Sequence, residues 1–379
     1  MKTTELQQPI NTGIAAINDA VQNKEESTQI IGAKCRALLR GYAIHWKDSQ
    51  YIPIEVEVVA SADIVNPATG YNSRILKTAG KLDVLATRPS MMSGSHKLTL
   101  IDHKTTSDEI ADPDGTYWQQ LAVESQPTHY MLLQWLNGIK LDEAMWDVLR
   151  KPSIAPRKLK SKAEHALVVA NQIYFNQRLS TETMNWLQVS DRENLELYEA
   201  RLFHDCTEER PEWYFQRRTI PRLDSELITY ATDLWDSGQL VLEARRKDRW
   251  PKHSGSCMNY GSPCRFLGIC SGQDQPTSAN WEKRESVHEE LSPDMDRNTL
   301  TYSSIRTFQT CPKKFYYHYH LGIKRIVEAD REALLFGHIW HLGLEAYWKS
   351  LQPKESNNGS GNSIENSGNR HECQEAYAF

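Results

Sequence analysis

The chain has 379 residues and a net charge of −5, with 25% charged and 39% hydrophobic residues. It is long enough for one large domain or two smaller ones, and its composition is that of an ordinary globular protein. No apolar run is long enough to cross a bilayer, and the acidic total does not by itself indicate nucleic-acid binding.

The first residues, Met1–Gln7, lack the apolar core of an export signal, and the chain contains seven cysteines. Cysteines in a chain without such a signal favour metal ligands or free thiols over disulfides. We therefore expect a cytoplasmic protein, or a phage-encoded one that acts in the host cytoplasm, with no membrane partner.

The first part of the chain predicts a helix followed by a small sheet. Apolar spacing favours a helix over residues 31–46, and residues 52–60 alternate apolar and acidic side chains as a strand does. Further strands are expected at residues 81–87 and 97–102, with turn-forming residues between them. Together these segments predict a small antiparallel meander with polar residues at the strand ends.

The next part of the chain predicts mainly helices. One helix contains Tyr130 and ends at Asn137-Gly138, with Ser125 as a candidate cap and Pro127 in its first turn. Helical patterns also cover residues 161–201 and 223–246.

The C-terminal part of the chain changes character twice. Residues 276–298 are polar and without periodicity, so we expect a linker. Residues 299–350 are aromatic and helical in pattern, and the tail at 351–379, rich in Ser, Asn and Gly, is expected to be disordered.

Two carboxylates and a lysine are the first candidates for a site. Period-two geometry places Asp102 and Lys104 on one face of a strand and His103 on the other, while Asp83 would end the preceding strand. Two carboxylates suit Mg²⁺, which keeps several waters and activates one of them for attack on a phosphate. Lys104 would orient or deprotonate that water. The alternative is a surface ion pair worth about 1 kcal/mol or less.

Gln126 and Tyr130 are separated by one helical turn and therefore share a face. They would contact a phosphate or order Lys104, the alternative being half-buried packing. The three motifs in chain order are Gly80-x-x-Asp83, Asp102-x-Lys104 and Gln126-x-x-x-Tyr130.

This set resembles the PD-(D/E)XK nuclease superfamily, in particular its RecB/AddB-like branch with an iron–sulfur cluster. The resemblance implies a restriction-endonuclease-like α/β (α+β) fold, with a small mixed sheet flanked by helices. It also implies that His341, in Gly337-x-x-x-His341, joins Asp83 and Asp102 as a ligand of Mg²⁺ or Mn²⁺. The Ile101 carbonyl or Glu345 would assist.

Three cysteines, Cys257, Cys264 and Cys270, lie in a stretch rich in Gly and Pro and need a fourth ligand for zinc or an iron–sulfur centre. The branch takes its fourth cysteine from a Phe-x-x-Cys-Pro segment, which matches Cys311 here. The resemblance therefore implies a C-terminal cysteine cluster that holds [4Fe-4S], with zinc as the alternative.

The order of these motifs differs from that of the family, in which the Cys-Pro and Gly-x-x-x-His segment comes first. One interpretation is a circular permutation, in which residues 299–350 fold back and complete a nuclease core formed by residues 1–275. The other is that residues 299–350 begin a second, truncated copy.

The resemblance predicts a metal-dependent nuclease, with an exonuclease favoured, that hydrolyses phosphodiester bonds in DNA recombination, repair or phage DNA processing. Its partners would be DNA and a helicase or recombination protein. Basic clusters at 150–162, 245–247 and 313–325 partly answer the objection of the acidic total, the alternative being that each is merely solvated surface. One alternative is a catalytically decayed DNA-binding or assembly module that keeps the fold and cluster. Another is a zinc-stabilised structural protein.

Overall fold

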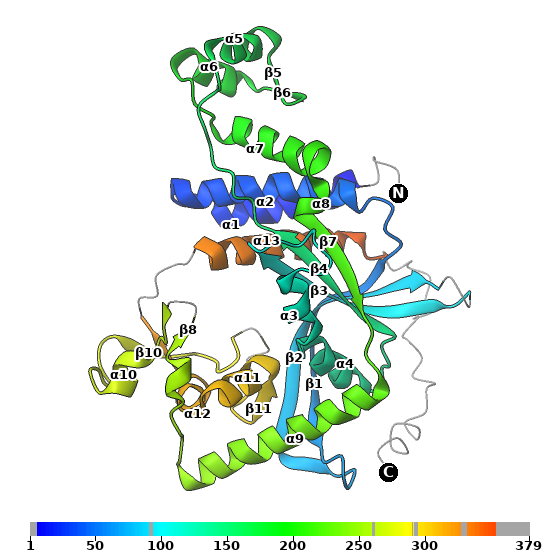
Figure 1. Cartoon of the computed structure of the whole chain (residues 1–379), viewed down its shortest axis with the longest axis vertical. Coiled ribbons are helices and arrows are strands. Elements are labelled where there is room, and N and C mark those ends of the chain that lie inside the picture. The colour runs from blue at the N-terminus through cyan, green and yellow to red at the C-terminus, as the bar shows by residue number, and fades with distance from the viewer. Residues whose placement is uncertain are drawn as a thin grey trace.

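The computed structural model describes residues 6–90, 94–259, 262–289, 291, 295–326 and 332–353. Its centre is a sheet in the order β1-β2-β3-β4-β7, with β11 paired to β2 (Figure 1). The strands are β1 (Ile52–Val65), β2 (Asn72–Pro89), β3 (His96–Thr106), β4 (Glu143–Arg150), β7 (Phe215–Ile220) and β11 (Thr299–Thr301).

The sheet is mixed, which confirms the expected fold class in its coarser form, a mixed sheet flanked by helices. Strands β1, β2 and β3 form the predicted antiparallel meander, whereas β3 and β4 are parallel and β4 and β7 antiparallel. The strands are longer than predicted. Asp83 and Asp102 consequently lie inside β2 and β3, so the expectation that they end their strands is wrong.

Three helices cover one face of the sheet: α1 (Gln7–Val21), α2 (Glu26–His45) and α13 (Glu332–Leu351). They lie side by side in Figure 1, although α13 comes more than 280 residues after α2. Their core includes Leu39 and Trp340, packed with Val84 and Ile101 of the sheet. Helix α2 corresponds to the helix predicted at 31–46 and begins earlier.

The other face is covered by α3 (Thr116–Ala122), α4 (Gln126–Leu136) and α9 (Asp224–Lys247). Helix α4 ends at Leu136 with Asn137 as its C-cap, close to the predicted end, and has Pro127 in its first turn, but the Ser125 side chain makes no capping hydrogen bond. Tyr130 and Leu133 of α4 pack against Leu82 of β2 in the second core.

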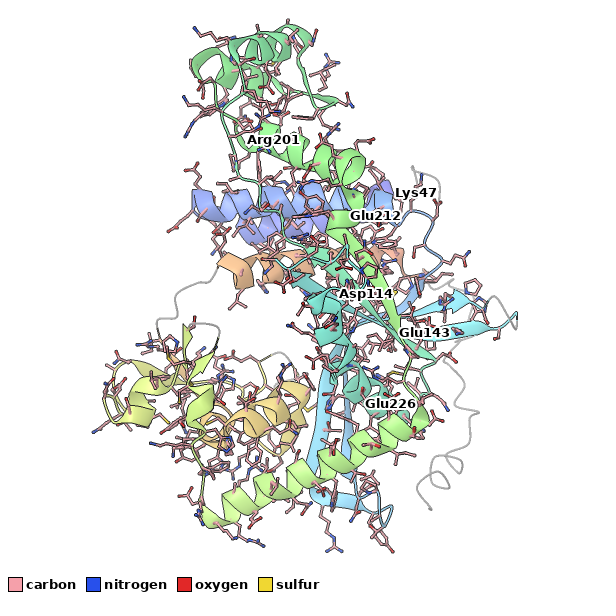
Figure 2. All side chains as sticks on the ribbon, in the orientation of Figure 1. Lys47, Asp114, Glu143, Arg201, Glu212 and Glu226 are labelled. Carbon is pink, nitrogen blue, oxygen red and sulfur yellow. The ribbon has the colours of Figure 1, made fainter. Side chains whose placement is uncertain are left out.

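A helical lobe is inserted between β4 and β7 and has a core of its own. Its elements are α5 (Lys162–Asn171), β5 (Ile173–Tyr174), β6 (Gln177–Arg178), α6 (Thr181–Val189) and α7 (Leu195–His204), after which come a π-helical turn at Asp205–Glu209 and α8 (Pro211–Tyr214). The helical pattern at 161–201 is interrupted because Gln172 is left-handed, and because Ser180 and Asn194 cap new helices. Arg201, labelled in Figure 2, ties the lobe to the preceding loop by donating to the Ala155 carbonyl at 2.9 Å.

A second small lobe surrounds the cysteines. It contains a 3₁₀ turn (Ser254–Ser256), β8 (Met258–Asn259), β9 (Ser262–Pro263), α10 (Leu267–Ser271), β10 (Trp281–Lys283), α11 (Tyr302–Thr310), α12 (Pro312–Phe315), a π-helical turn (Tyr316–His320) and β12 (Ile323–Arg325). Strand β10 lies within the stretch expected to be a linker, pairs with β12 and buries Trp281. Almost all of the predicted tail, residues 354–379, lies outside the described residues. None of the described helices is long and apolar enough to cross a membrane.

Candidate active site

The candidate site lies where β2 and β3 separate. The two strands pair from Pro89 and His96 as far as Val84 and Ile101, and no further. Asp83 and Asp102 are the next residues along each strand and therefore face each other at this fork. A side-chain oxygen of Asp83 accepts a hydrogen bond from the His103 backbone N–H at 2.8 Å, which replaces the missing strand pairing.

The remaining predicted residues form a continuous chain of contacts. Lys104 Nζ lies 2.5 Å from Asp102 Oδ2 and donates to Gln126 Oε1 at 2.8 Å. Gln126 Nε2 in turn donates to the Tyr130 hydroxyl at 3.0 Å. The ammonium group also lies 5.1 Å from the centre of the Trp146 ring. The structure therefore favours the interpretation that Gln126 and Tyr130 order Lys104.

Gly80 allows α4 to approach β2 this closely. A Cβ atom at Gly80 would lie 2.6 Å from the Tyr130 ring, which is closer than any real contact. The glycine of the Gly80-x-x-Asp83 motif therefore has a packing role, because a side chain there would push Tyr130 away from the site.

His341 reaches the fork from α13. One ligand atom each from Glu57, Asp83 and His341 lie within 4.8 Å of one another. Atoms that share a Mg²⁺ ion lie up to about 4 Å apart, because each metal–oxygen bond is about 2.1 Å. These three residues therefore fit a divalent ion after a small inward movement. Asp102 is not a member of this group and pairs with Lys104 instead.

Sequence reasoning missed Glu57, which it treated as an ordinary polar position of a strand. Glu57 lies between the pairs Val56–Val84 and Val58–Leu82, directly opposite Asp83. The alternation of apolar and acidic residues in β1 carries no sign of this role. The distinguishing feature is its backbone φ of 59°, which appears only in the structure.

Burial shifts the pKa values of ionisable groups in the site. Burial, and then the charge of Asp102, raises the pKa of Asp83 to about 7. Burial, and then the nearby His103 and Lys104, lowers the pKa of His341 to about 3, so its imidazole is neutral near pH 7. A neutral imidazole is a suitable ligand for a divalent cation, and so is a carboxylate whose negative charge is not fully offset by nearby positive charges.

A buried network supports the site from behind. His103 Nδ1 lies 3.1 Å from Asp147 Oδ2, Asp147 Oδ1 lies 3.2 Å from Arg217 Nε, and the Tyr42 hydroxyl donates to Asp147 at 2.5 Å. The His103 ring stands edge-on to that of His341, with centres 6.2 Å apart. This network connects β3, β4 and β7 with the helix that carries His341.

The four cysteines predicted as a cluster lie in one lobe. Cys264 N–H donates to the Cys257 carbonyl at 2.8 Å, Cys270 lies on α10, and Cys311 precedes α12. Burial raises the pKa of the Cys270 thiol, Lys252 opposes this shift, and the other three cysteines add to it. All four are free thiols, and in the described part of the chain no cysteine belongs to a group with ligand atoms within 4.8 Å of one another. Cys35 and Cys206 are buried core residues.

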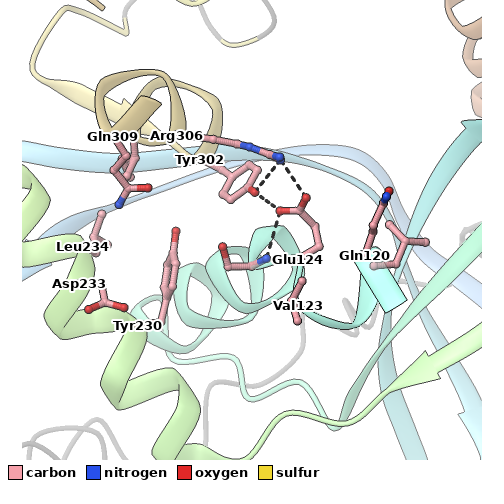
Figure 3. Close-up of a pocket in the computed structure, with 12 residues that line it drawn as sticks. Gln120, Val123, Glu124, Tyr230, Asp233, Leu234, Tyr302, Arg306 and Gln309 are labelled. Atoms are coloured by element: carbon pink, nitrogen blue, oxygen red, sulfur yellow. Dashed lines mark hydrogen bonds and ion pairs between the residues drawn. The ribbon is translucent and has the colours of Figure 1, made fainter. Parts of the chain in front are cut away.

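A separate pocket of about 640 Å³ lies beside the start of α4 (Figure 3). It lies between the end of α3 with the turn that follows it, α9 and α11, and it is lined by Tyr230, Tyr302 and Gln309 among others. Glu124 bridges its rim, accepting from Arg306 at 2.8 Å and from the Tyr302 hydroxyl. None of the predicted site residues lines this pocket.

Residues 299–371 match the family model described as the PD-(D/E)XK nuclease superfamily. The matched segment begins with β11 and contains Cys311 and His341, so this similarity is independent of the carboxylates at the fork. No curated protein and no solved structure matches the chain.

Proposed function

We propose that this chain is a Mg²⁺- or Mn²⁺-dependent phosphodiesterase of the PD-(D/E)XK type that acts on DNA. One observation carries the proposal. His341, from the segment that matches the nuclease superfamily, meets Asp83 beside the linked Asp102, Lys104 and Gln126. Two parts of the chain that are far apart in sequence thus contribute to one candidate centre.

The proposed roles follow from these contacts. Asp83 and His341 would hold the ion, with Asp102 next to them across the fork. When bound, the ion would lower the pKa of a water and offset charge on the phosphate. The Lys104 ammonium, held by Asp102, Gln126 and through it Tyr130, would orient the attacking water and stabilise developing negative charge.

Basic residues near the fork support a nucleic-acid substrate. Residues 150–162 contain six basic and no acidic side chains. The segment leaves the sheet beside the site, because Lys151 N–H donates to the Thr106 carbonyl at 2.7 Å, two residues beyond Lys104. It then runs to the helical lobe, where Lys158, Lys160 and Lys162 are exposed. Exposed lysines suit the phosphate backbone without selecting a sequence.

Within this proposal the enzyme is an exonuclease of recombination, repair or phage DNA processing, with a helicase or recombination protein as partner. The cysteine lobe would hold a [4Fe-4S] cluster on Cys257, Cys264, Cys270 and Cys311, with zinc as the alternative. Metal analysis of anaerobically purified protein distinguishes these metals, because four irons with visible absorption indicate the cluster and one colourless zinc indicates the alternative.

The decisive experiment is the substitution Lys104→Ala. It should abolish Mg²⁺-dependent degradation of DNA while the protein still folds and unfolds cooperatively, since Lys104 itself is 28% exposed. Lys97→Ala is the matched control. Lys97 lies on the same strand, is 41% exposed and pairs with Glu143 away from the fork, so its loss should leave activity intact. Undiminished activity of Lys104→Ala would refute the assigned chemistry. An inactive parent protein that still binds metal would instead favour a decayed DNA-binding module.

A further inference from the structure

Glu57 is the residue at the fork that neither the superfamily motifs nor the predicted site includes. Its side chain is 13% exposed and forms an ion pair with Lys81. Its carboxylate nevertheless lies in the same group of ligand atoms as Asp83 and His341. An ordinary strand residue that serves only a surface ion pair does not need to be placed so close to a histidine and a second carboxylate.

The way in which β1 and β2 fold around Glu57 explains this placement. Val56 and Val84 pack in the core beneath α13, whereas Val58 and Leu82 pack in the core on the opposite face. Residues two apart in a regular strand share a face. The alternation of side chains between the two faces is therefore interrupted in both strands between these pairs. The positive φ of Glu57 marks the change in β1. As a result, Glu57 and Asp83 both approach α13, which carries His341.

His341 itself has room for a ligand. Within the part of the chain that the structure describes, its imidazole makes a ring contact with His103 but has no hydrogen-bond partner. Metal-binding histidines present one ring nitrogen to the ion, and an uncommitted nitrogen facing two carboxylates has the donor set of such a site.

We infer that Glu57 is a ligand of the divalent cation, which it would hold together with Asp83 and His341. Asp102 lies next to these ligands across the fork and is paired with Lys104, which it would hold in place. This inference rests on the proposed function, because it adds one ligand to the same centre. The inference places the cation on the side of the fork formed by Glu57, Asp83 and His341, and the Lys104 ammonium on the side formed by Asp102.

Binding of Mn²⁺, followed by electron paramagnetic resonance and by calorimetry, tests this ligand without any assay of activity. Glu57→Gln should weaken Mn²⁺ binding at least about tenfold, because loss of groups around a bound metal commonly costs 10 to 100-fold in affinity. Glu55→Gln is the matched control. Glu55 is an exposed glutamate on the same strand, two residues earlier, and its substitution should leave the affinity unchanged.

Two further variants separate failure of this inference from failure of the proposed function. Asp83→Asn and His341→Ala should both weaken Mn²⁺ binding. If they do so and Glu57→Gln does not, Glu57 is not a ligand and the proposed centre stands. If none of the three changes the affinity, the metal centre of the proposed function is itself wrong.

Lys81→Met distinguishes a ligand from a residue that acts only through its ion pair. Removal of the competing ammonium should leave Mn²⁺ binding at least as tight as in the parent protein. An affinity loss equal to that of Glu57→Gln would show that Glu57 acts through Lys81, and would overturn the inference. Glu57→Asn, a residue type that tolerates positive φ, checks folding. Without metal it should unfold at or above the parent temperature, and it should lose the Mn²⁺-induced rise in that temperature.

Discussion

At the scale of single residues, the site contains side chains with shifted pKa values and one residue with a strained backbone. Asp83 and His341 are both perturbed by burial, the first toward protonation and the second toward neutrality. Glu57 is perturbed in its backbone, because a residue with a Cβ atom rarely adopts a positive φ within a strand. Such strain persists only where the surrounding structure enforces it, and it is often found at functional positions.

The strain at Glu57 predicts an unusual response to glycine. Glycine adopts positive φ freely, so Glu57→Gly should stabilise the metal-free protein by about 1 kcal/mol. Glu55→Gly should instead destabilise it by about 1 kcal/mol, because glycine in a regular strand loses more conformational freedom on folding. Urea unfolding in the presence of a chelator measures both effects. Equal destabilisation by the two substitutions would contradict the assigned strain.

The Asp147 network predicts a defined dependence of stability on pH. Burial favours the neutral acid, but Arg217 and His103 outweigh it and hold the pKa of Asp147 well below its usual range. The stability due to this depression is present above the ordinary Asp pKa of about 3.9 and is lost as the pH falls below it. For His103, burial is outweighed by Asp147, so its pKa is raised. That contribution is present below about pH 6.5 and is lost as the pH rises past the raised value.

The network should therefore stabilise the fold most between about pH 4 and 6.5. In this window Asp147→Asn should cost about 3 to 5 kcal/mol, because it leaves buried cations unpaired. Asp191→Asn, which breaks an exposed pair with Lys158, should cost about 1 kcal/mol or less. Urea unfolding at several pH values provides the measurement. A penalty for Asp147→Asn that does not change with pH would show that the network is not ionised as described.

At the scale of elements, the position of His341 depends on how closely α13 packs on α1. A Cβ atom at Gly343 would lie 2.8 Å from the Ile17 side chain, and one at Gly13 would lie 2.7 Å from the Gly343 carbonyl. Small residues at this crossing allow the two helix backbones to meet. His341 lies two residues before Gly343, so a displacement of the helix here would be transmitted to the fork.

Gly343→Val tests this dependence. Overpacking at the crossing should destabilise the protein by about 1 to 3 kcal/mol and weaken Mn²⁺ binding by moving His341. Adding Ile17→Ala creates space on the facing helix and should restore part of both losses, which a double-mutant cycle would detect as coupling. Strictly additive effects would mean that the two residues do not meet as described.

At the scale of the whole molecule, the C-terminal segment belongs to the same sheet and core as the first half of the chain. Strand β11 pairs in parallel with Lys77–Ala79 of β2, the part of β2 that no longer pairs with β3. Helix α13 contributes Trp340 and Leu344 to the core that α1 and α2 also build. The interpretation that residues 299–350 complete the core by circular permutation predicts such an arrangement, and it stays a prediction.

A chain that ends at residue 298 tests whether the segment is structurally required. It would lose β11 and α13, and the core beneath α13 would be open to water. We expect no cooperative unfolding transition and strong binding of a hydrophobic dye. Co-expression with a fragment of residues 299–353 should restore cooperative unfolding and Mn²⁺ binding. A truncated chain that folds cooperatively by itself would show that the segment is an independent addition.

The sequence by itself determined the elements and motifs that depend on local pattern. The meander, α4 and α9 follow from periodicity and end signals, and the contacts of Lys104 with Asp102 and of Gln126 with Tyr130 follow from two-residue and four-residue spacing. The broken helical pattern at 161–201 was less predictable, because caps and left-handed residues interrupt it without changing its composition.

The tertiary structure alone decided which distant residues meet. Periodicity carries no information on whether α13 returns to the sheet, and therefore none on the distance from His341 to Asp83. Periodicity also gives no reason to distinguish Glu57 from other polar positions of its strand. The shift in side-chain alternation at Glu57 depends on how β1 and β2 pack against two different cores, one on each face of the sheet. Local pattern reports the conformation of a segment, whereas a binding site depends on close packing between segments, and packing is a property of the whole fold.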